Sequence, residues 1–258
     1  MRTLILCGIF AACAGAQSFV DTPPILQLVR MPTVGAGLSR PYGEAGAAVN
    51  VIGMAAITGL PETWLLEAHW SFASIEGLDR GLSSLPARSG APSDPLLDDV
   101  LLSSRTMIAL YRPGWSYRPA DALRLWARAR YVHVSILRIR AGTESDIGDL
   151  VRLRKATSES VNLDRPDLAY RVVSGAPSGT FIFLSPLLSL GTLDDNVTTL
   201  PGYTRGLAAA PAKESAKIAF ESEISQEDLL FRIDPRISRV SDGFAELDQE
   251  FWRGKPAK

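Results

Sequence analysis

The chain has 258 residues, a formal net charge of −1 at pH 7 and 46% hydrophobic residues. This length and composition allow a sizeable buried core, either in one large domain or in two small ones. The near-neutral charge offers no basic face to nucleic acid and no acidic tail, so we predict no nucleic-acid partner.

The first residues have the pattern of a secretory signal. Arg2 is the positive start, residues 4–12 form a short apolar segment, and residues 14–16 read Ala-Gly-Ala, a small-x-small cleavage site. We therefore predict a signal peptide over residues 1–16 and a periplasmic or secreted protein. A lipid anchor on Cys13 is the alternative, but the three residues before this cysteine fit a lipidation motif poorly.

Cleavage at this site removes the only two cysteines, Cys7 and Cys13. The mature chain must then be held together by its core without disulfides. No later apolar run approaches the ~20 residues that a spanning helix needs, so we predict no integral membrane span.

Eight strands and five helices are predicted along the chain from period-two alternation, helical spacing and turn residues. The strands cover residues 25–31, 49–57, 63–71, 106–113, 130–142, 168–175, 180–186 and 228–234. The helices cover residues 72–82, 96–105, 143–162, 187–195 and 210–226. The order is β-α-β-β-α-β twice, with the first helix of the first half replaced by the Gly- and Pro-rich residues 37–46.

The two halves share a Gly-x-Pro turn, "ITGLPE" and "VSGAPS", before their third strand. Gly59 and Gly175 of these turns are 116 positions apart, whereas Arg30 and Arg138 in the first strands are 108 apart. The difference matches the missing helix in the first half. Chance similarity of two hairpin turns is the alternative, but the shared element order favours duplication.

A β-α-β-β-α-β unit is typical of the ferredoxin-like fold, with helices on one sheet face only. We therefore predict an α+β protein in which two tandem ferredoxin-like units pair their antiparallel sheets into one pseudo-dimeric α/β barrel. The predicted parts are the signal peptide 1–16, a first unit 23–113 with a shortened helix 1, a connector 114–129, a second unit 130–234 and a C-terminal tail 235–258. Phe251 and Trp252 are predicted to anchor this tail on the body or on a partner subunit.

Residues 130–156 and 170–195 carry a resemblance to a known family. They resemble the dimeric α/β-barrel superfamily, which includes antibiotic-biosynthesis monooxygenase-type and NIPSNAP-like domains, here in tandem. The whole chain after the signal, including residues 231–256, is similar to a group of exported bacterial proteins of unknown function. The resemblance implies the fold above all, because the superfamily has no invariant catalytic motif. For an enzyme it implies cofactor-independent oxidation or isomerisation.

Strand alternation assigns each side chain to one of two faces. Val132, Val134 and Ile136 form an apolar face suited to the helices, so the opposite faces are predicted to line the barrel interior. The side chains predicted to point into it are Glu67, His69, Tyr131, His133, Ser135, Phe181, Phe183 and Ser185. An apolar cavity with a few polar groups is typical of a small-molecule site.

The predicted catalytic residues are His69, His133 and Glu67, with a histidine as proton acceptor. The predicted ligand-binding residues are Tyr131, Ser135, Phe181, Phe183 and Ser185. The alternatives are half-buried histidines with satisfied hydrogen bonds, a cross-strand charge at Glu67 and an aromatic pair at Tyr131. No His-x-His or His-Glu-x-x-His spacing occurs, so neither a metal nor another cofactor is predicted.

Two functional hypotheses remain open. In the first, the barrel binds a small apolar or aromatic molecule and possesses oxygenase or isomerase activity. In the second, it is a non-catalytic interaction or structural protein with a solid core. The chain is predicted to be a monomer with a pseudo-dimeric barrel or a homodimer.

Overall fold

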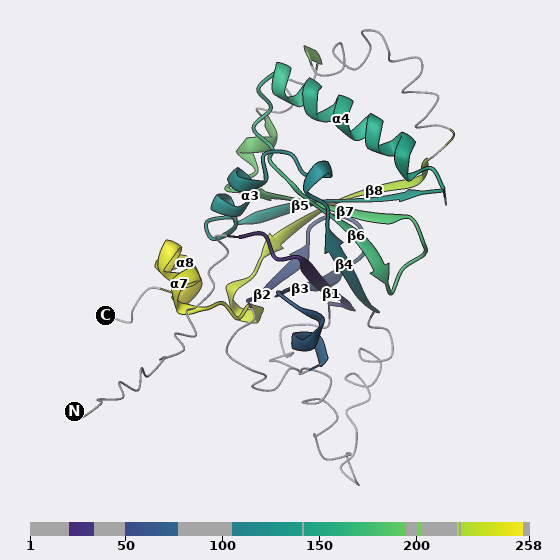
Figure 1. The fold of residues 1–258 in the computed structure, drawn as a ribbon. Helices are drawn as coiled ribbons and strands as arrows, with labels where there is room; N and C mark the ends of the chain where they lie inside the picture. Colours follow the sequence, from purple (N-terminus) through teal and green to yellow (C-terminus); the bar gives the residue numbers. More distant parts are fainter. Residues whose placement is uncertain are drawn as a thin grey trace, which may run out of the picture.

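The computed structural model describes residues 21–33, 50–76, 105–140, 142–194, 201–202, 221 and 223–254. Eight strands lie in this part of the chain (Figure 1). They are β1 (Ile25–Pro32), β2 (Val51–Ala56), β3 (Glu62–His69), β4 (Arg105–Tyr111), β5 (Tyr131–Ile139), β6 (Leu168–Ser174), β7 (Thr180–Leu187) and β8 (Glu223–Ile233). Each contains most of a predicted strand, so the predicted strands are confirmed.

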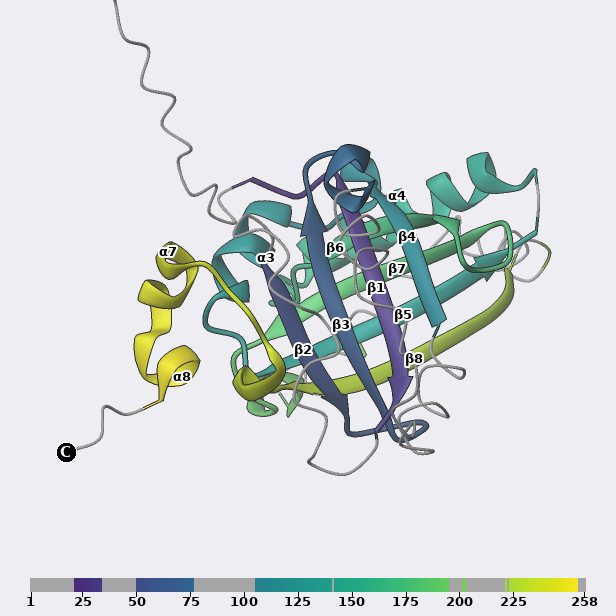
Figure 2. The same cartoon turned by 90° about the horizontal axis from the view of Figure 1, so that it is seen from below.

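The strands form a closed barrel in the order β1-β3-β2-β8-β5-β7-β6-β4 (Figure 2). The neighbouring strands are antiparallel. One half of the barrel reads β4-β1-β3-β2 and the other reads β8-β5-β7-β6, which is the same ferredoxin-like order in each unit. The second strand of each unit pairs with the fourth strand of the other, at β2–β8 and β4–β6. The predicted fold class is therefore confirmed.

The strand register agrees with the two sequence offsets. Arg30 of β1 pairs with Trp64 of β3, and Arg138 of β5 pairs with Thr180 of β7. The first-strand offset of 108 relates Arg30 to Arg138, and the third-strand offset of 116 relates Trp64 to Thr180. The first and third strands of the two units therefore pair in the same register.

One face of every strand points into a common apolar core. It contains large side chains such as Leu28, Trp64, Tyr170 and Phe231, each at most 1% exposed. Val132 and Val134, which the sequence assigned to a face under the helices, belong to this core. Eight strands leave an interior that side chains can just fill, which explains why the inward positions are large and apolar.

The helix predicted over residues 143–162 is confirmed as α4 (Glu144–Ser160), which lies across the second sheet (Figure 1). Its Ile147 and Val151 pack on Leu137 and Phe181 of that sheet.

The short helix α3 (Pro119–Trp126) follows the 3-10 turn η1 (Pro113–Trp115) within the predicted connector. This helix was not predicted, although Pro119 stands in its first turn, where proline is tolerated.

The other predicted helices are only partly within the described residues. Residues 72–76 and 191–194 are helical, in agreement with two of them. The helix predicted over residues 210–226 is wrong at its end, because residues 223–226 belong to β8. The helices predicted over residues 96–105 and 187–195 are also wrong at one end, because Arg105 begins β4 and Leu187 ends β7. Residues 188–190 are not helical either, whereas residue 221 is. The rest of these segments, residues 37–46 and the predicted signal peptide lie outside the described part. Within that part, no helix is long and apolar enough to cross a membrane.

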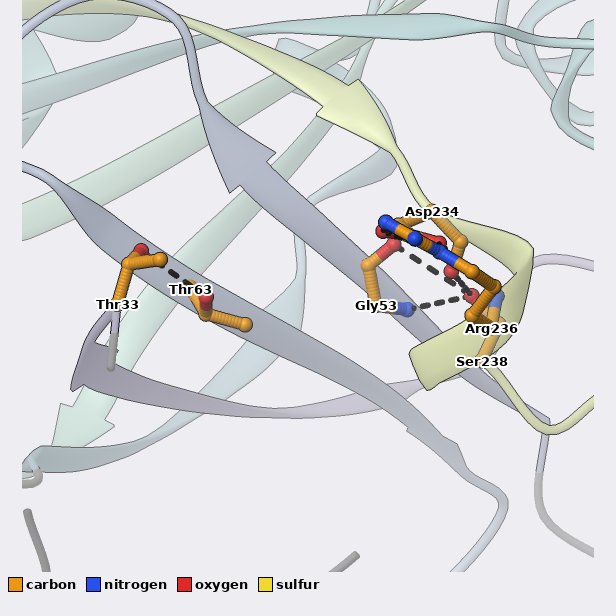
Figure 3. A network of polar contacts seen from close by, with 6 residues as sticks. All are labelled: Thr33, Gly53, Thr63, Asp234, Arg236 and Ser238. Carbon is orange, nitrogen blue, oxygen red and sulfur yellow. Dashed lines mark hydrogen bonds and ion pairs between the residues drawn. The ribbon is translucent and has the colours of Figure 1, made fainter. Parts of the chain in front are cut away.

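The C-terminal tail crosses the outer face of β2. Gly53 donates its backbone N–H to Oγ of Ser238 over 2.9 Å, and the Ser238 hydroxyl donates to the carbonyl of Asp234 over 2.7 Å. Figure 3 shows these residues side by side. The turn η2 (Pro235–Ile237) packs so closely that a Cβ atom on Gly53 would lie 2.8 Å from the carbonyl oxygen of Ile237. Glycine at position 53 therefore permits the contact.

Beyond this crossing, α7 (Asp242–Ala245), η3 (Glu246–Asp248) and α8 (Gln249–Arg253) pack beside α3. The Trp252 indole N–H donates to the carbonyl of Ala127 over 2.7 Å, and Arg130 lies 3.9 Å from the centre of the Phe251 ring. The prediction that the two aromatic residues anchor the tail on the body is confirmed.

Candidate functional site

The eight predicted site residues lie on the outer faces of the sheets, so their assignment to the interior is wrong. Phe181, for example, packs with α4 outside the barrel, whereas its neighbour Ile182 belongs to the interior core. The sequence divided the side chains of each strand correctly between two faces, but it assigned the wrong face to the barrel interior. The physical reason is closure of the barrel, which makes the interior the position most shielded from water and draws the continuously apolar face inward.

The interior itself is filled by side chains. A cavity of about 20 Å³ lies between the strands near Trp126, and its lining is apolar apart from the indole N–H of Trp126 and the hydroxyl of Tyr170. Such a volume holds about one water molecule, whereas ligand pockets usually measure at least ~300 Å³. This cavity is therefore too small to hold the predicted ligand.

The predicted residues divide between two outer faces. Glu67 and His69 lie on β3 of the first sheet, and the other six lie on β5 and β7 of the second. Strands β2 and β8 separate these groups around the barrel. The structure therefore does not bring all eight residues to one site.

On the second sheet, the aromatic residues are used in packing. Phe181 is fully buried, and its ring stacks on Trp115 of η1 with 4.3 Å between the ring centres. The Phe183 ring lies 6.4 Å from the same indole. Trp115 was missed in the sequence because it lies outside the predicted strands. Phe181 thus leaves no ring face available to a ligand.

His133 also lies on the second sheet, with its side chain 15% exposed. A guanidinium nitrogen of Arg165 is 3.3 Å from Nδ1, and a guanidinium can only donate, so Nδ1 must accept. The ring proton is then on Nε2, 3.6 Å from Oδ1 of Asp228, which also accepts a hydrogen bond from Ser135. The lone pair of His133 is therefore occupied.

Burial and the nearby Arg165 charge lower the pKa of His133 to about 4, against the opposing effect of Asp228. In the unfolded chain this histidine has an ordinary pKa and binds a proton near pH 6.5. In the folded chain it binds the proton only near pH 4. We expect the free energy of unfolding to fall between pH 6.5 and 4 by about 2 to 3 kcal/mol from this group. Urea unfolding at pH 7, 5 and 4 should show that the free energy of unfolding falls less in His133→Gln than in wild type. Parallel pH profiles for the two proteins would contradict it.

His69 on the first sheet is in a different environment. Its side chain is 0% exposed, and that of Glu67 is 3% exposed. Nδ1 of His69 lies 2.9 Å from Oγ of Ser74, whose hydroxyl donates to the carbonyl of Ser71 over 2.6 Å. Because the single hydroxyl proton is used on Ser71, Ser74 must accept from Nδ1–H. In the neutral ring, Nε2 therefore carries the lone pair.

The Nε2 atom makes no hydrogen bond within the described residues. Oε2 of Glu67 lies 3.5 Å away, close enough for an ion pair with a protonated ring but without hydrogen-bond geometry. Gln27 pairs with Glu67 across β1 and β3, and its buried Oε1 also lacks a partner. Gln27 was missed in the sequence because only the strand register places it opposite Glu67. Buried acceptors without donors are unusual, and a catalytic role is one explanation for them.

The comparisons with known proteins concern the fold. No protein-family model matches the sequence, and no curated protein matches it. Among solved structures, an anthrone oxidase-like protein gives a TM-score of 0.52 at 8% identity, over 87% of this chain and 96% of its own. A mutant of chlorite dismutase from Candidatus Nitrospira defluvii gives a TM-score of 0.49 at 7% identity, over 91% of this chain and 98% of its own. The chain therefore has the fold of a dimeric α/β barrel, with both halves in one chain.

The two units of the barrel each carry one histidine at an equivalent place. Ile25 pairs with His69 in the first unit, and His133 pairs with Ser185 in the second. The sequence offsets relate Ile25 to His133 and His69 to Ser185. Each histidine thus lies in the corresponding cross-strand pair of its own unit. His69 is on the third strand of the first unit, and His133 is on the first strand of the second unit. Only His69 has a free lone pair in the described structure.

Proposed function

We propose that the outer face of the first sheet binds a small molecule and that His69 accepts a proton from it. The observation that carries the proposal is the lone pair on Nε2 of a fully buried imidazole, without a hydrogen-bond partner in the described part of the chain. Ser74 holds the opposite ring nitrogen and orients this lone pair. An oriented imidazole is a suitable general base near neutral pH.

Glu67 supports this role through its charge. When the ligand's proton passes to Nε2, the ring becomes an imidazolium, and the carboxylate 3.5 Å away stabilises that cation. The bonding electrons remain on the ligand as an anion. Removal of a proton is the first step of both cofactor-independent oxidation and isomerisation, the reactions that the family resemblance implies.

The surroundings support an apolar or aromatic ligand. Ile25 lies opposite His69 in the sheet, and Val29, Met31 and Leu65 form a buried apolar cluster on the same outer face. A mostly apolar site with a few polar groups is typical for small organic molecules. The ligand then needs an acidic C–H or O–H group that faces Nε2.

Native mass spectrometry of the protein from its own host tests this proposal. We expect a co-purifying small molecule with wild type and with the matched control His133→Ala, and its loss or about tenfold weaker retention in His69→Ala. Glu67→Gln should weaken retention less, because the amide keeps the shape of the side chain. Equal retention by His69→Ala and wild type would overturn the assignment.

The filled barrel interior favours one alternative, a non-catalytic interaction or structural protein. A clean apo mass, together with an unchanged melting temperature across a library of aromatic compounds, would support this alternative.

We also propose that the protein is exported after cleavage behind Ala16. The support is the signal pattern of the first residues. The intact mass of the protein from the host periplasm or medium should correspond to a chain that begins at Gln17. A full-length cytoplasmic mass would contradict export, and a mass with a lipid on Cys13 would favour the anchored alternative.

A further inference from the structure

We infer that the free edge of β8 accepts an extended, basic segment of a partner protein as an additional strand. The free edge is the side of residues 223–229 that faces away from β5. Figure 2 shows β8 continuing past β2 at the rim of the barrel. This edge belongs to the second unit, so the inference does not rest on the proposed function at His69.

Strand β8 is paired along its full length on one side only. Its register with β5 runs from Glu223 opposite Ile139 to Arg232 opposite Tyr131. On the other side, β2 pairs only with residues 231–233. The turn after β2 covers residue 230, whose carbonyl accepts the N–H of residue 57 over 2.7 Å and whose N–H donates to Oγ1 of residue 58 over 2.9 Å. Within the described residues, no strand covers this side of residues 223–229.

The backbone groups that point to the free edge follow from the strand geometry. Alternate residues of an antiparallel strand direct their N–H and C=O groups to opposite sides. Ile233 donates its N–H to the carbonyl of Arg130 on the β5 side, whereas Leu230 bonds to the turn on the other side. The N–H and C=O groups of Gln226 and Asp228 therefore point to the free edge. They have no hydrogen-bond partner within the described part of the chain.

This edge is accessible and already has the conformation of a strand. Residues 225–228 are all exposed, and pairing with β5 holds them extended. The edge contains no proline, which would remove donors from it. Strand addition to an exposed sheet edge obtains affinity from main-chain hydrogen bonds and specificity from side chains. The free edge of β8 can therefore receive one more strand without rearrangement.

The charge of the edge indicates a basic partner segment. Glu227 is exposed and forms no ion pair within the described residues. Asp228 is 47% exposed, although it accepts hydrogen bonds from Ser135 and Gln226. Neighbouring residues of a strand point to opposite faces, so the edge carries one carboxylate on each face. Lys or Arg residues opposite these two positions would form cross-strand pairs of opposite charge.

A second copy of the chain fits this edge less well. Symmetric pairing of two β8 edges would bring the carboxylates of Glu227 and Asp228 close to those of the other copy. Like charges that face each other across a sheet are destabilising, and charged side chains on an edge strand protect against self-association. The two acidic residues therefore disfavour a second copy and leave the edge open to a basic strand.

Fluorescence anisotropy of a labelled heptapeptide, Thr-Val-Lys-Arg-Val-Thr-Val, tests the inference on the full chain. We expect binding at about 50 mM salt that weakens at about 500 mM, because salt screens exposed charges. Gln226→Pro should weaken binding at least about tenfold, since proline removes a donor from the free edge. Proline is tolerated where a strand N–H faces solvent, so the pairing with β5 should persist. The matched control Gln226→Ala keeps this N–H and should bind like wild type.

The charge is tested separately with Glu227→Lys. This variant should bind the basic peptide more weakly than wild type, and it should bind more tightly the same peptide with Glu in place of Lys and Arg. Because Glu227 is exposed, this variant also decides the question if Gln226→Pro does not fold. Tighter binding of the acidic peptide than of the basic one by wild type would contradict a basic partner.

Equal binding by Gln226→Pro and Gln226→Ala would overturn the inference, and so would the absence of binding to wild type at about 1 mM peptide. A wild-type dimer in sedimentation equilibrium without peptide, lost in Gln226→Pro, would assign the edge to a second copy instead. Retention of the co-purifying molecule should be the same in Gln226→Pro and wild type, so the proposed function at His69 is judged independently.

Discussion

Replacing Gly175 with alanine is expected to destabilise the protein far more than the same replacement at Gly59. These glycines lie in the two copies of the repeated turn, with φ angles of +85° and +82°. An alanine in this left-handed region costs about 1–2 kcal/mol at either position. The surroundings then decide the difference between them.

At Gly175, an added Cβ atom would overlap the carbonyl oxygen of Thr106 and lie 2.9 Å from Cα of Met107. These are backbone atoms of β4, at the junction between the two units, and they cannot move without disturbing strand pairing. At Gly59, the close neighbour is the end of the Leu229 side chain at 2.8 Å, which can rotate.

We therefore expect Gly59→Ala to lower the free energy of unfolding by about 1–2 kcal/mol, and Gly175→Ala by more than about 3 kcal/mol. Urea unfolding followed by circular dichroism measures both values. If the two variants lose the same free energy, the close approach of the second turn to β4 is not present in solution.

The Trp64→Ala replacement is the second change with a large expected effect. Trp64 is 0% exposed in the barrel interior, and its ring centre lies 4.5 Å from that of Phe231. Its indole N–H donates to Glu62 over 2.7 Å, and Arg30 lies 4.6 Å from the ring centre. Removal of the indole leaves a cavity and takes a donor from Glu62, so we expect a loss of about 3–5 kcal/mol.

The same variant tests whether the interior is filled. Buried apolar cavities made by truncation bind small aromatic molecules, so indole should raise the melting temperature of Trp64→Ala and leave wild type unchanged. Phe72→Ala is the matched control, because Phe72 is 54% exposed and its loss should cost less than about 0.5 kcal/mol. Stabilisation of wild type by indole to the same extent would show that the interior already has room for a ligand.

The strands were predictable because their signal is local. Alternation in residues 131–139 and the turns at Gly59 and Gly175 do not depend on distant contacts. The helix α3 was missed because its stability comes from burying Trp126 against the barrel, which is a tertiary effect. The N-terminal residues of β8 were predicted as helix because Glu and Ser residues there show no strand pattern, whereas pairing with β5 extends the strand.

The candidate site was only partly predictable for a similar reason. Glu67 and His69 could be identified from residue type and from their shared strand face. Their place on the outside of the barrel, the partnership with Ser74 and the approach of Gln27 depend on how the strands pair. The free lone pair of His69 and the occupied one of His133 likewise depend on neighbours distant in sequence, such as Arg165.

The sequence by itself determined the strands, the repeated unit and the grouping of side chains by face, because alternation and turn chemistry act over a few residues. Only the tertiary structure decided which face points inward. An alternating strand is compatible with either orientation, and closure of eight strands around a common interior selects the face that can exclude water. The same closure placed both histidines outside and gave one of them a free nitrogen.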